Sequence, residues 1–291
     1  MGSILGCIRG LWATRLTEDV KDDKDLYVRT TLRELVLYLI FLINICIMTL
    51  GNTSTTHFYF TNVLQSLFLT ESGENGVAFN SITKIEDFWA FVEEPLLDGL
   101  YWEHWYNGDS LPANETGYIF FENKLLGVPR VRQVKVRNDS CVIHRDFRDD
   151  IQGCYQNFDA ANEETREFGA FNEDCSEHAK YTDDCPWKHR SNEELGGISY
   201  KSSELKFNYP SGGFSMDLAQ TKTETVVMFT DLRKDLWIDR GTRAVFIDFT
   251  VYNPNINLFC VIKLVAEMPA TGGVITSSSF STVNLLRFKG K

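Results

Sequence analysis

The chain has 291 residues, and its 40 acidic and 29 basic side chains give a formal net charge of −11. Nucleic acid and anionic lipid both repel so acidic a chain, so we expect neither as its partner. About 240 residues follow the most apolar segment, which is enough for one large domain with a core of its own.

Residues 35–50 carry no charge and predict a helix that spans a membrane. At about 1.5 Å per residue the run covers roughly 24 Å, slightly less than a hydrocarbon core of about 30 Å. Residues 1–34 hold six Lys and Arg side chains and residues 51–83 hold none, which predicts a cytoplasmic N-terminus and an outer location for the remainder. A cleaved signal peptide is the alternative, but six acidic side chains before the run are atypical of one.

Further helices are predicted where apolar residues recur at helical spacing, at residues 55–69, 83–95 and 223–236. The second of these begins with a capping box, in which Thr83 is the N-cap and Glu86 follows three residues later. Pro95 is expected to end that helix, because proline lacks the backbone N–H that a helix interior needs.

Strands are predicted at residues 130–137, 244–252 and 256–266. The last two flank the turn-forming Asn253-Pro-Asn255 and are expected to form an antiparallel hairpin. Residues 155–205 differ from the rest, because twelve acidic side chains outnumber five basic ones and aliphatic residues are few. This composition favours an exposed excursion from a domain that is otherwise α+β.

Four basic side chains on the first strand form a stripe, at Arg130, Arg132, Lys135 and Arg137. Valines alternate with them, so the simplest interpretation is the solvent side of the strand. The functional interpretation is a contact with an acidic neighbouring subunit.

Seven cysteines divide by location. Cys7 precedes the membrane segment, Cys46 lies in it, and Cys260 lies in an apolar run typical of a buried core. The remaining four form two local pairs, Cys141 with Cys154 and Cys175 with Cys185. Closing a loop of about fifteen residues stabilises a fold by roughly 3 kcal/mol in the chain-entropy model.

Cys175, His178, Cys185 and His189 also have a C-x2-H and C-x3-H arrangement that could hold zinc. The spacer between the two halves is shorter than in zinc fingers, and an oxidising compartment favours a Cys175–Cys185 disulfide instead. Unpaired thiols in a loop are the third alternative. We expect no bound metal.

Three glycosylation sequons lie beyond the membrane segment, at Asn52, Asn114 and Asn138. Asn52 follows the apolar run so closely that it is expected to be out of reach of the transferase, so Asn114 and Asn138 are the predicted sites. The chain has no nucleophile elbow, P-loop, dinucleotide fingerprint, His-Glu-x-x-His motif or EF-hand loop. We therefore expect no cofactor and no enzymatic activity.

Ten motifs resemble the polycystin-2-type channel family, and together they cover nearly the whole chain except residues 1–8 and 159–207. They are Gly10-Leu-Trp-Ala-Thr-Arg-Leu16, Leu32-Arg-Glu-Leu35, Glu86-Asp-Phe-Trp89, Leu96-Leu-Asp-Gly-Leu-Tyr-Trp102, Glu122-Asn-Lys-Leu-Leu-Gly-Val-Pro-Arg130, Val136-Arg-Asn-Asp-Ser-Cys141, Trp237-Ile-Asp-Arg-Gly-Thr-Arg243, Phe246-Ile-Asp-Phe249, Tyr252-Asn-Pro-Asn-Ile-Asn-Leu-Phe-Cys260 and Pro269-Ala-Thr-Gly-Gly273.

The resemblance implies a glycosylated extracellular polycystin domain, a helix-backed antiparallel sheet between the first two of six membrane helices. It implies membership of tetrameric, Ca²⁺-permeable cation channels of the plasma membrane, cilium or endoplasmic reticulum, in which this domain contacts neighbouring subunits. The family's disulfide matches Cys141 and Cys154.

We therefore expect a cytoplasmic segment 1–34, a membrane helix 35–51, a polycystin domain 52–282 and, at 283–291, the approach to a second membrane helix. The chain stops there, without the pore elements of the family. The expected function is assembly or gating within a homo- or hetero-tetrameric channel. The alternative is a single-pass binding module that modulates such channels or captures a ligand.

Overall fold

The computed structural model describes residues 24–50, 55–112, 116–169 and 185–284, and the chain divides into two compact units at Thr55. In the first unit, α2 (Lys24–Leu50) is one continuous helix. Its segment Val28–Thr49 is long and apolar enough to cross a membrane, and none of its most apolar stretch is buried. The predicted helix is confirmed. It begins at Lys24, eleven residues before the uncharged run, because charged side chains are compatible with a helix outside the hydrocarbon core of a membrane.

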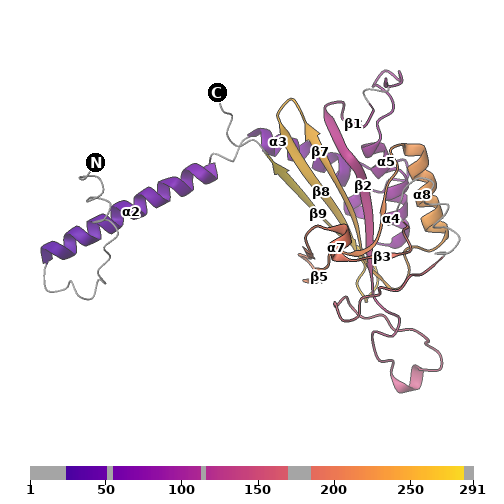
Figure 1. Ribbon diagram of the computed structural model, residues 1–291. Helices are drawn as coiled ribbons and strands as arrows, with labels where there is room; N and C mark the ends of the chain where they lie inside the picture. Colours follow the sequence, from indigo (N-terminus) through magenta and orange to yellow (C-terminus); the bar gives the residue numbers. More distant parts are fainter. Residues whose placement is uncertain (1–23, 51–54, 113–115, 170–184, 285–291) are drawn as a thin grey trace. The chain divides into compact units, whose positions relative to one another are not determined.

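The second unit is built on an antiparallel sheet with the strand order β3-β6-β2-β7-β8-β9, to which β1 is added beside β2 (Figure 1). The strands are β1 (Tyr118–Ile119), β2 (Asn123–Lys135), β3 (His189–Arg190), β6 (Gly213–Asp217), β7 (Thr242–Asn253), β8 (Leu258–Glu267) and β9 (Ile275–Val283). A separate hairpin pairs β4 (Tyr200–Lys201) with β5 (Asn208–Tyr209).

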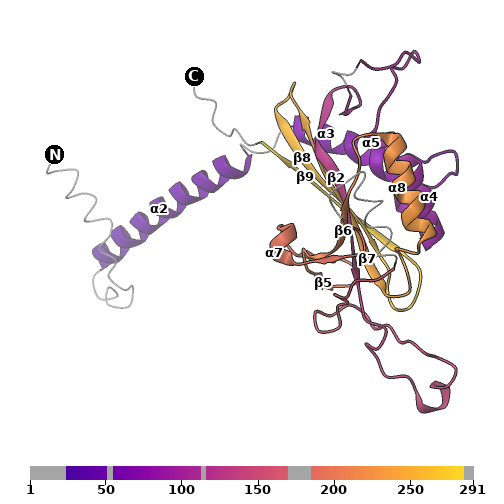
Figure 2. The same cartoon turned by 45° about the vertical axis from the view of Figure 1, so that its right-hand side comes forward.

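One face of the sheet is covered by helices (Figures 1 and 2). These are α3 (Thr55–Gln65), which continues into a π-helical turn η2 (Ser66–Thr70), the 3₁₀ turn η3 (Phe79–Ser81), α4 (Ile85–Glu93), α5 (Pro95–Leu100) and α8 (Lys222–Lys234). Leu64, Phe88 and Met228 from the helices pack with Val245 and Ile247 of β7 in one large core. The expected α+β fold, an apolar helix followed by an antiparallel sheet with helices, is confirmed.

The opposite face of the sheet carries a second, smaller core near the ends of the strands. Val134, Phe246 and Val265 of the sheet pack there against Phe158 and Tyr209. The β4–β5 hairpin therefore covers part of this face, and the connections η4 (Arg145–Phe147) and α7 (Asn192–Leu195) lie in the long excursion between β2 and β6.

The predicted hairpin is confirmed, with β7 and β8 in continuous register from Ala244↔Glu267 to Asn253↔Leu258. Cys260 is buried, as its apolar run predicted. The predicted capping box is wrong: Lys84 is the N-cap of α4, and the backbone N–H and hydroxyl of Thr83 both donate to Asp87 instead of pairing with Glu86. Pro95 does end the helix, and it also begins α5.

The prediction that residues 155–205 form an exposed excursion is wrong for three parts of it. Phe158 and Trp187 are buried, and His189–Arg190 joins the sheet as β3. The small number of aliphatic residues in this segment did not indicate that it is exposed, because single large aromatic side chains anchor it to the cores.

Candidate functional site: a charged groove on the open face of the sheet

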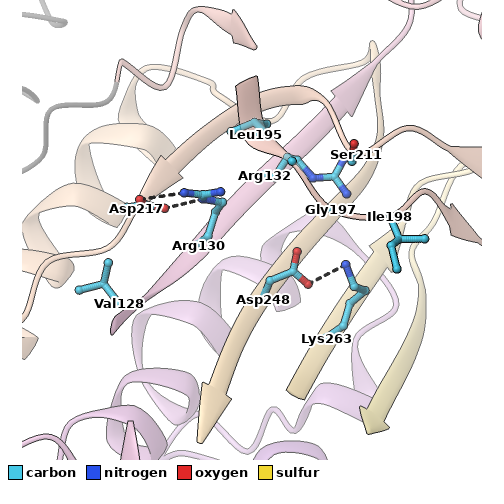
Figure 3. A pocket seen from close by; sticks show the side chains of 11 residues that line it. Val128, Arg130, Arg132, Leu195, Gly197, Ile198, Ser211, Asp217, Asp248 and Lys263 are labelled. Atoms are coloured by element: carbon cyan, nitrogen blue, oxygen red, sulfur yellow. Dashed lines mark hydrogen bonds and ion pairs between the residues drawn. The ribbon is translucent and has the colours of Figure 1, made fainter. Parts of the chain in front are cut away.

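A groove of about 380 Å³ lies on the face of the sheet that the helices do not cover (Figure 3). Its floor comes from the four neighbouring strands β6, β2, β7 and β8, and one wall comes from the segment that follows α7. The lining side chains are Val128, Arg130, Arg132, Leu195, Ile198, Ser211, Asp217, Asp248 and Lys263, with the backbone of Gly196 and Gly197.

A row of alternating charges crosses the floor of the groove. Arg130 stands opposite Asp217 on one side and Asp248 on the other, and Asp248 stands opposite Lys263. Arg130 donates two hydrogen bonds to the carboxylate of Asp217, from Nε at 2.6 Å and from Nη2 at 3.0 Å. Lys263 Nζ lies 2.9 Å from Asp248 Oδ1. Opposite charges on directly facing residues stabilise each strand pair and fix its register.

A β-bulge in β2 precedes the first of these charges. The register of β2 against β7 shifts between Leu126 and Arg130, and Gly127 has a φ of +70°. Glycine adopts this left-handed conformation without strain. The bulge therefore re-aims the strand, so that Arg130 and Arg132 face the groove.

Arg132 lies deeper and is only 3 % exposed. Its guanidinium stacks 4.0 Å from the ring of Phe246, and Nη1 donates to the carbonyls of Pro210 and Gly212 at 3.0 and 2.8 Å. Burial lowers the pKa of Arg132 to about 10, against the opposing effect of Asp248, so the guanidinium stays charged at neutral pH.

The wall beside Arg132 is held in place by α7. Ser191 caps this short helix, with its hydroxyl accepting from Glu194 N–H, while Asn192 Oδ1 accepts from Gly212 N–H at 2.6 Å. Gly196 and Gly197 then have φ values of +64° and +94°, which turn the chain back over the groove.

The predicted basic stripe is not one solvent-facing surface, and that interpretation is corrected here. Arg132 and Lys135 are buried, because the excursion between β2 and β6 covers the sheet and a second register shift precedes Lys135. Lys135 donates to Asp239 at 2.7 Å and lies 3.4 Å from the ring of Phe168. Burial lowers its pKa, and Asp239 opposes this effect. Arg130 and Arg137 remain partly exposed.

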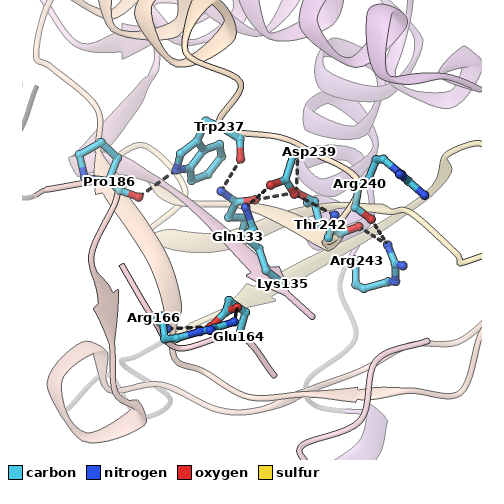
Figure 4. Close-up of polar contacts among 11 residues, drawn as sticks. Gln133, Lys135, Glu164, Arg166, Pro186, Trp237, Asp239, Arg240, Thr242 and Arg243 are labelled. Atoms are coloured by element: carbon cyan, nitrogen blue, oxygen red, sulfur yellow. Dashed lines mark hydrogen bonds and ion pairs between the residues drawn. The ribbon is translucent and has the colours of Figure 1, made fainter. Parts of the chain in front are cut away.

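Lys135 belongs to a polar cluster at the end of the sheet (Figure 4). Gln133 donates from Nε2 to the Trp237 carbonyl at 2.7 Å and accepts from the Thr242 hydroxyl at 2.9 Å. Trp237 Nε1 donates to the carbonyl of Pro186, and Arg243 Nε donates to that of Gln156. These bonds tie the excursion to the strands, so the cluster is structural.

Cys141 and Cys154 form a disulfide with their Cα atoms 5.4 Å apart. The loop that they close is exposed, and the neighbouring sequon residue Asn138 is exposed as well. Asn52, Asn114, Cys7, Cys175 and His178 lie outside the described residues, so the Cys175–Cys185 disulfide stays a prediction. His189 lies 3.3 Å from Glu163. The described residues hold no cluster of three or more metal-ligating side chains.

Comparison with known proteins adds the family to this geometry. Residues 78–286, most of the chain, match the model of the polycystin domain. The chain belongs to the polycystin-2-like family. It is 48 % identical to Polycystin-2-like protein 1 of Homo sapiens over 97 % of its own length. It is 43 % identical to Polycystin-2 of Danio rerio over 98 %, and 44 % identical to Polycystin-2-like protein 2 of Homo sapiens over 91 %.

The chain covers 33 %, 30 % and 41 % of these three relatives, so it spans about a third of their length. The polycystins are a family of channels and not of enzymes, which agrees with the lack of catalytic motifs in the sequence.

Sequence reasoning named Arg130 and Arg132 but missed Asp217, Asp248 and Lys263. The last two lie within predicted strands, at positions that alternate with the apolar face. That alternation could have placed Asp248 and Lys263 on the open face. No local signal identifies Asp217, because β6 is a five-residue strand that the excursion brings back to the sheet.

Proposed function

We propose that this chain is the extracellular assembly and gating part of a polycystin-2-like, Ca²⁺-permeable cation channel, anchored by the helix α2. Three observations support the proposal: the family match over residues 78–286, the apolar helix before it, and the uncovered sheet face with its row of charges. The charged sheet face carries most weight, because a solvent-facing row of this kind gives a neighbouring subunit both register and specificity.

In this proposal the domain contacts the next subunit of a homo- or hetero-tetramer through the groove. Arg130 takes part at the edge of the groove, and Arg132 acts from within by holding one wall, while Lys135 ties the excursion to the end of the sheet. Arg137, which is exposed beside Asp139, is a second point of contact. In this proposal the domain acts through the subunits with which it assembles.

Co-expression with human Polycystin-2-like protein 1 tests the proposal. We expect the two proteins to co-purify in mild detergent, and the whole-cell current of the relative to fall, since each copy of residues 1–291 that assembles displaces a subunit of the relative. Lys263→Glu, which places like charges opposite each other, should weaken co-purification at least fivefold. Lys201→Glu on β4, an exposed lysine outside the groove, is the matched control and should have no effect.

Failure of the wild-type chain to co-purify would refute the subunit role. In that case the single-pass binding module remains, and the groove is its binding surface.

A further inference from the structure

Among the described residues, only one of the three guanidinium nitrogens of Arg132 donates hydrogen bonds. Nη1 is occupied by the carbonyls of Pro210 and Gly212, whereas among the described residues Nε and Nη2 donate no hydrogen bond. These two atoms form the side-on edge of the guanidinium, which matches the two oxygens of a carboxylate. A buried, charged group with unused donors is costly unless a partner completes it.

The charged side chains that line the groove favour a ligand with one negative charge. Three cationic and two anionic side chains line it, which leaves one net positive charge in a chain whose total is −11. Two of the cations are already committed, because Arg130 binds Asp217 and Lys263 binds Asp248. Asp248 and Glu163 act on Arg132 without forming an ion pair with it, so Arg132 is the lining cation that a bound monoanion would pair.

The dimensions and walls of the groove restrict the ligand further. A volume of about 380 Å³ exceeds what a free acetate needs and suits a side chain together with the backbone on either side of it. Ile198 is 86 % exposed at the mouth, and Leu195 and Val128 are half-buried beside it. Apolar side chains beside one charged group without an ion-pair partner are typical of a pocket that receives one residue of another polypeptide.

We propose that the groove binds the carboxylate of an Asp or Glu side chain presented by a neighbouring polypeptide, with Arg132 Nε and Nη2 as the bidentate donors. The inference rests on the proposed subunit contact for the source of this carboxylate. The binding chemistry itself depends only on the groove of this chain.

The test uses the full chain in lipid nanodiscs and two tripeptide probes, Ac-Ala-Glu-Ala-NH2 and Ac-Ala-Gln-Ala-NH2, which differ only in the carboxylate. Binding is measured by saturation-transfer NMR. We expect the Glu probe to bind in the millimolar range and the Gln probe to bind at least fivefold more weakly. Acetate should displace the Glu probe only weakly, and inorganic phosphate should displace it no better than acetate.

Two variants act on the groove in different ways. Arg132→Lys keeps the charge but removes the side-on fork, and Arg145→Lys, at an exposed position outside the groove, is the matched control. Ile198→Asp adds a negative charge at the exposed mouth, where the fold does not depend on the side chain. Both groove variants should weaken binding of the Glu probe at least fivefold, and the control should not.

Equal binding of the two tripeptides would overturn the inference, as would preferential displacement by phosphate. If Arg132→Lys does not fold, Ile198→Asp decides: unchanged binding of the Glu probe refutes the site. Because this assay contains no channel relative, its failure alongside preserved co-purification rejects only the carboxylate site. Loss of co-purification with intact probe binding rejects only the subunit role.

Discussion

At the scale of single residues, the second core buries a carboxyl group that has no cationic partner among the residues that the structure describes. Glu267 of β8 is fully buried and accepts hydrogen bonds from Ser202 at 2.8 Å and Tyr209 at 3.1 Å. Burial raises the pKa of Glu267, the two hydroxyl donors oppose the shift, and Glu204 adds to it. The same burial, with the charge of Glu267 beside it, raises the pKa of Tyr209, while Arg243 lowers it.

The first prediction concerns the pH dependence of stability. A carboxyl group whose pKa is raised in the folded state holds its proton more tightly there, so its contribution is fully present below the unfolded pKa of about 4.3 and is lost as pH rises through the folded pKa. The side chain introduced by Glu267→Gln cannot titrate. The difference in thermal midpoint, variant minus wild type, should therefore increase as pH rises from 4 to 8. Glu74→Gln, at an exposed position that does not affect Glu267, serves as the control, and parallel curves for Glu267→Gln and wild type would contradict the prediction.

The second prediction compares a buried hydrogen bond with a partly exposed ion pair. Gln133→Leu leaves the buried carbonyl of Trp237 without its donor and should cost about 1–3 kcal/mol of unfolding free energy. Asp217→Asn only weakens a pair that water screens, and should cost about 1 kcal/mol or less. Denaturant unfolding measures both, and a larger loss for Asp217→Asn would reverse the ranking.

At the scale of elements, the excursion between β2 and β6 is held by a few discrete attachments. The disulfide closes its first loop, and Cys154 N–H donates to the carbonyl of Asn138 at 2.8 Å. Trp187 and Phe158 then anchor it to the two cores. An excursion attached at separate points can lose one attachment without losing the sheet.

The third prediction follows from that arrangement. The double variant Cys141→Ala/Cys154→Ala should lower the unfolding free energy by about 3 kcal/mol, as the chain-entropy model gives for a loop of this size. The domain should remain folded, while limited proteolysis under native conditions should cut within residues 142–153. Reduced wild-type protein should behave like the double variant, and cleavage in β7 or β8 at the same protease level would contradict local loosening.

At the scale of the whole molecule, the part of the chain that the structure describes has one helix long and apolar enough to cross a membrane, and it precedes the folded domain. Our fourth prediction is therefore a single crossing with a cytoplasmic N-terminus, because the basic side chains lie before the helix. Protease added to intact cells should remove the domain and leave an N-terminal tag protected. An N-terminal tag that is accessible from outside would rule out this topology.

The fifth prediction is that Asn114 and Asn138 carry glycans and Asn52 does not. Asn138 is exposed beside the disulfide, and Asn52 follows the membrane helix by only two residues. Glycosidase treatment should increase the electrophoretic mobility of the protein, and the double variant Asn114→Gln/Asn138→Gln should abolish the shift. Asn52→Gln is the control and should leave the shift intact.

The sequence by itself determined the elements whose signals are local. The uncharged run at 35–50 and the alternation of Val245 and Ile247 depend on neighbours within one helix or one hairpin, so periodicity was sufficient to find them. The disulfide came from the resemblance to a family, since spacing alone left its pairing open.

Only the tertiary structure determined which of the basic side chains are buried and that the groove exists. Two register shifts in β2 redirect its side chains, and the excursion buries Arg132 and Lys135 that alternation had placed in solvent. The groove joins charges from four strands, and Asp217 is 87 residues from the Arg130 that it binds. Contacts at such separations depend on the order of strands in the sheet, which no local pattern of side chains specifies.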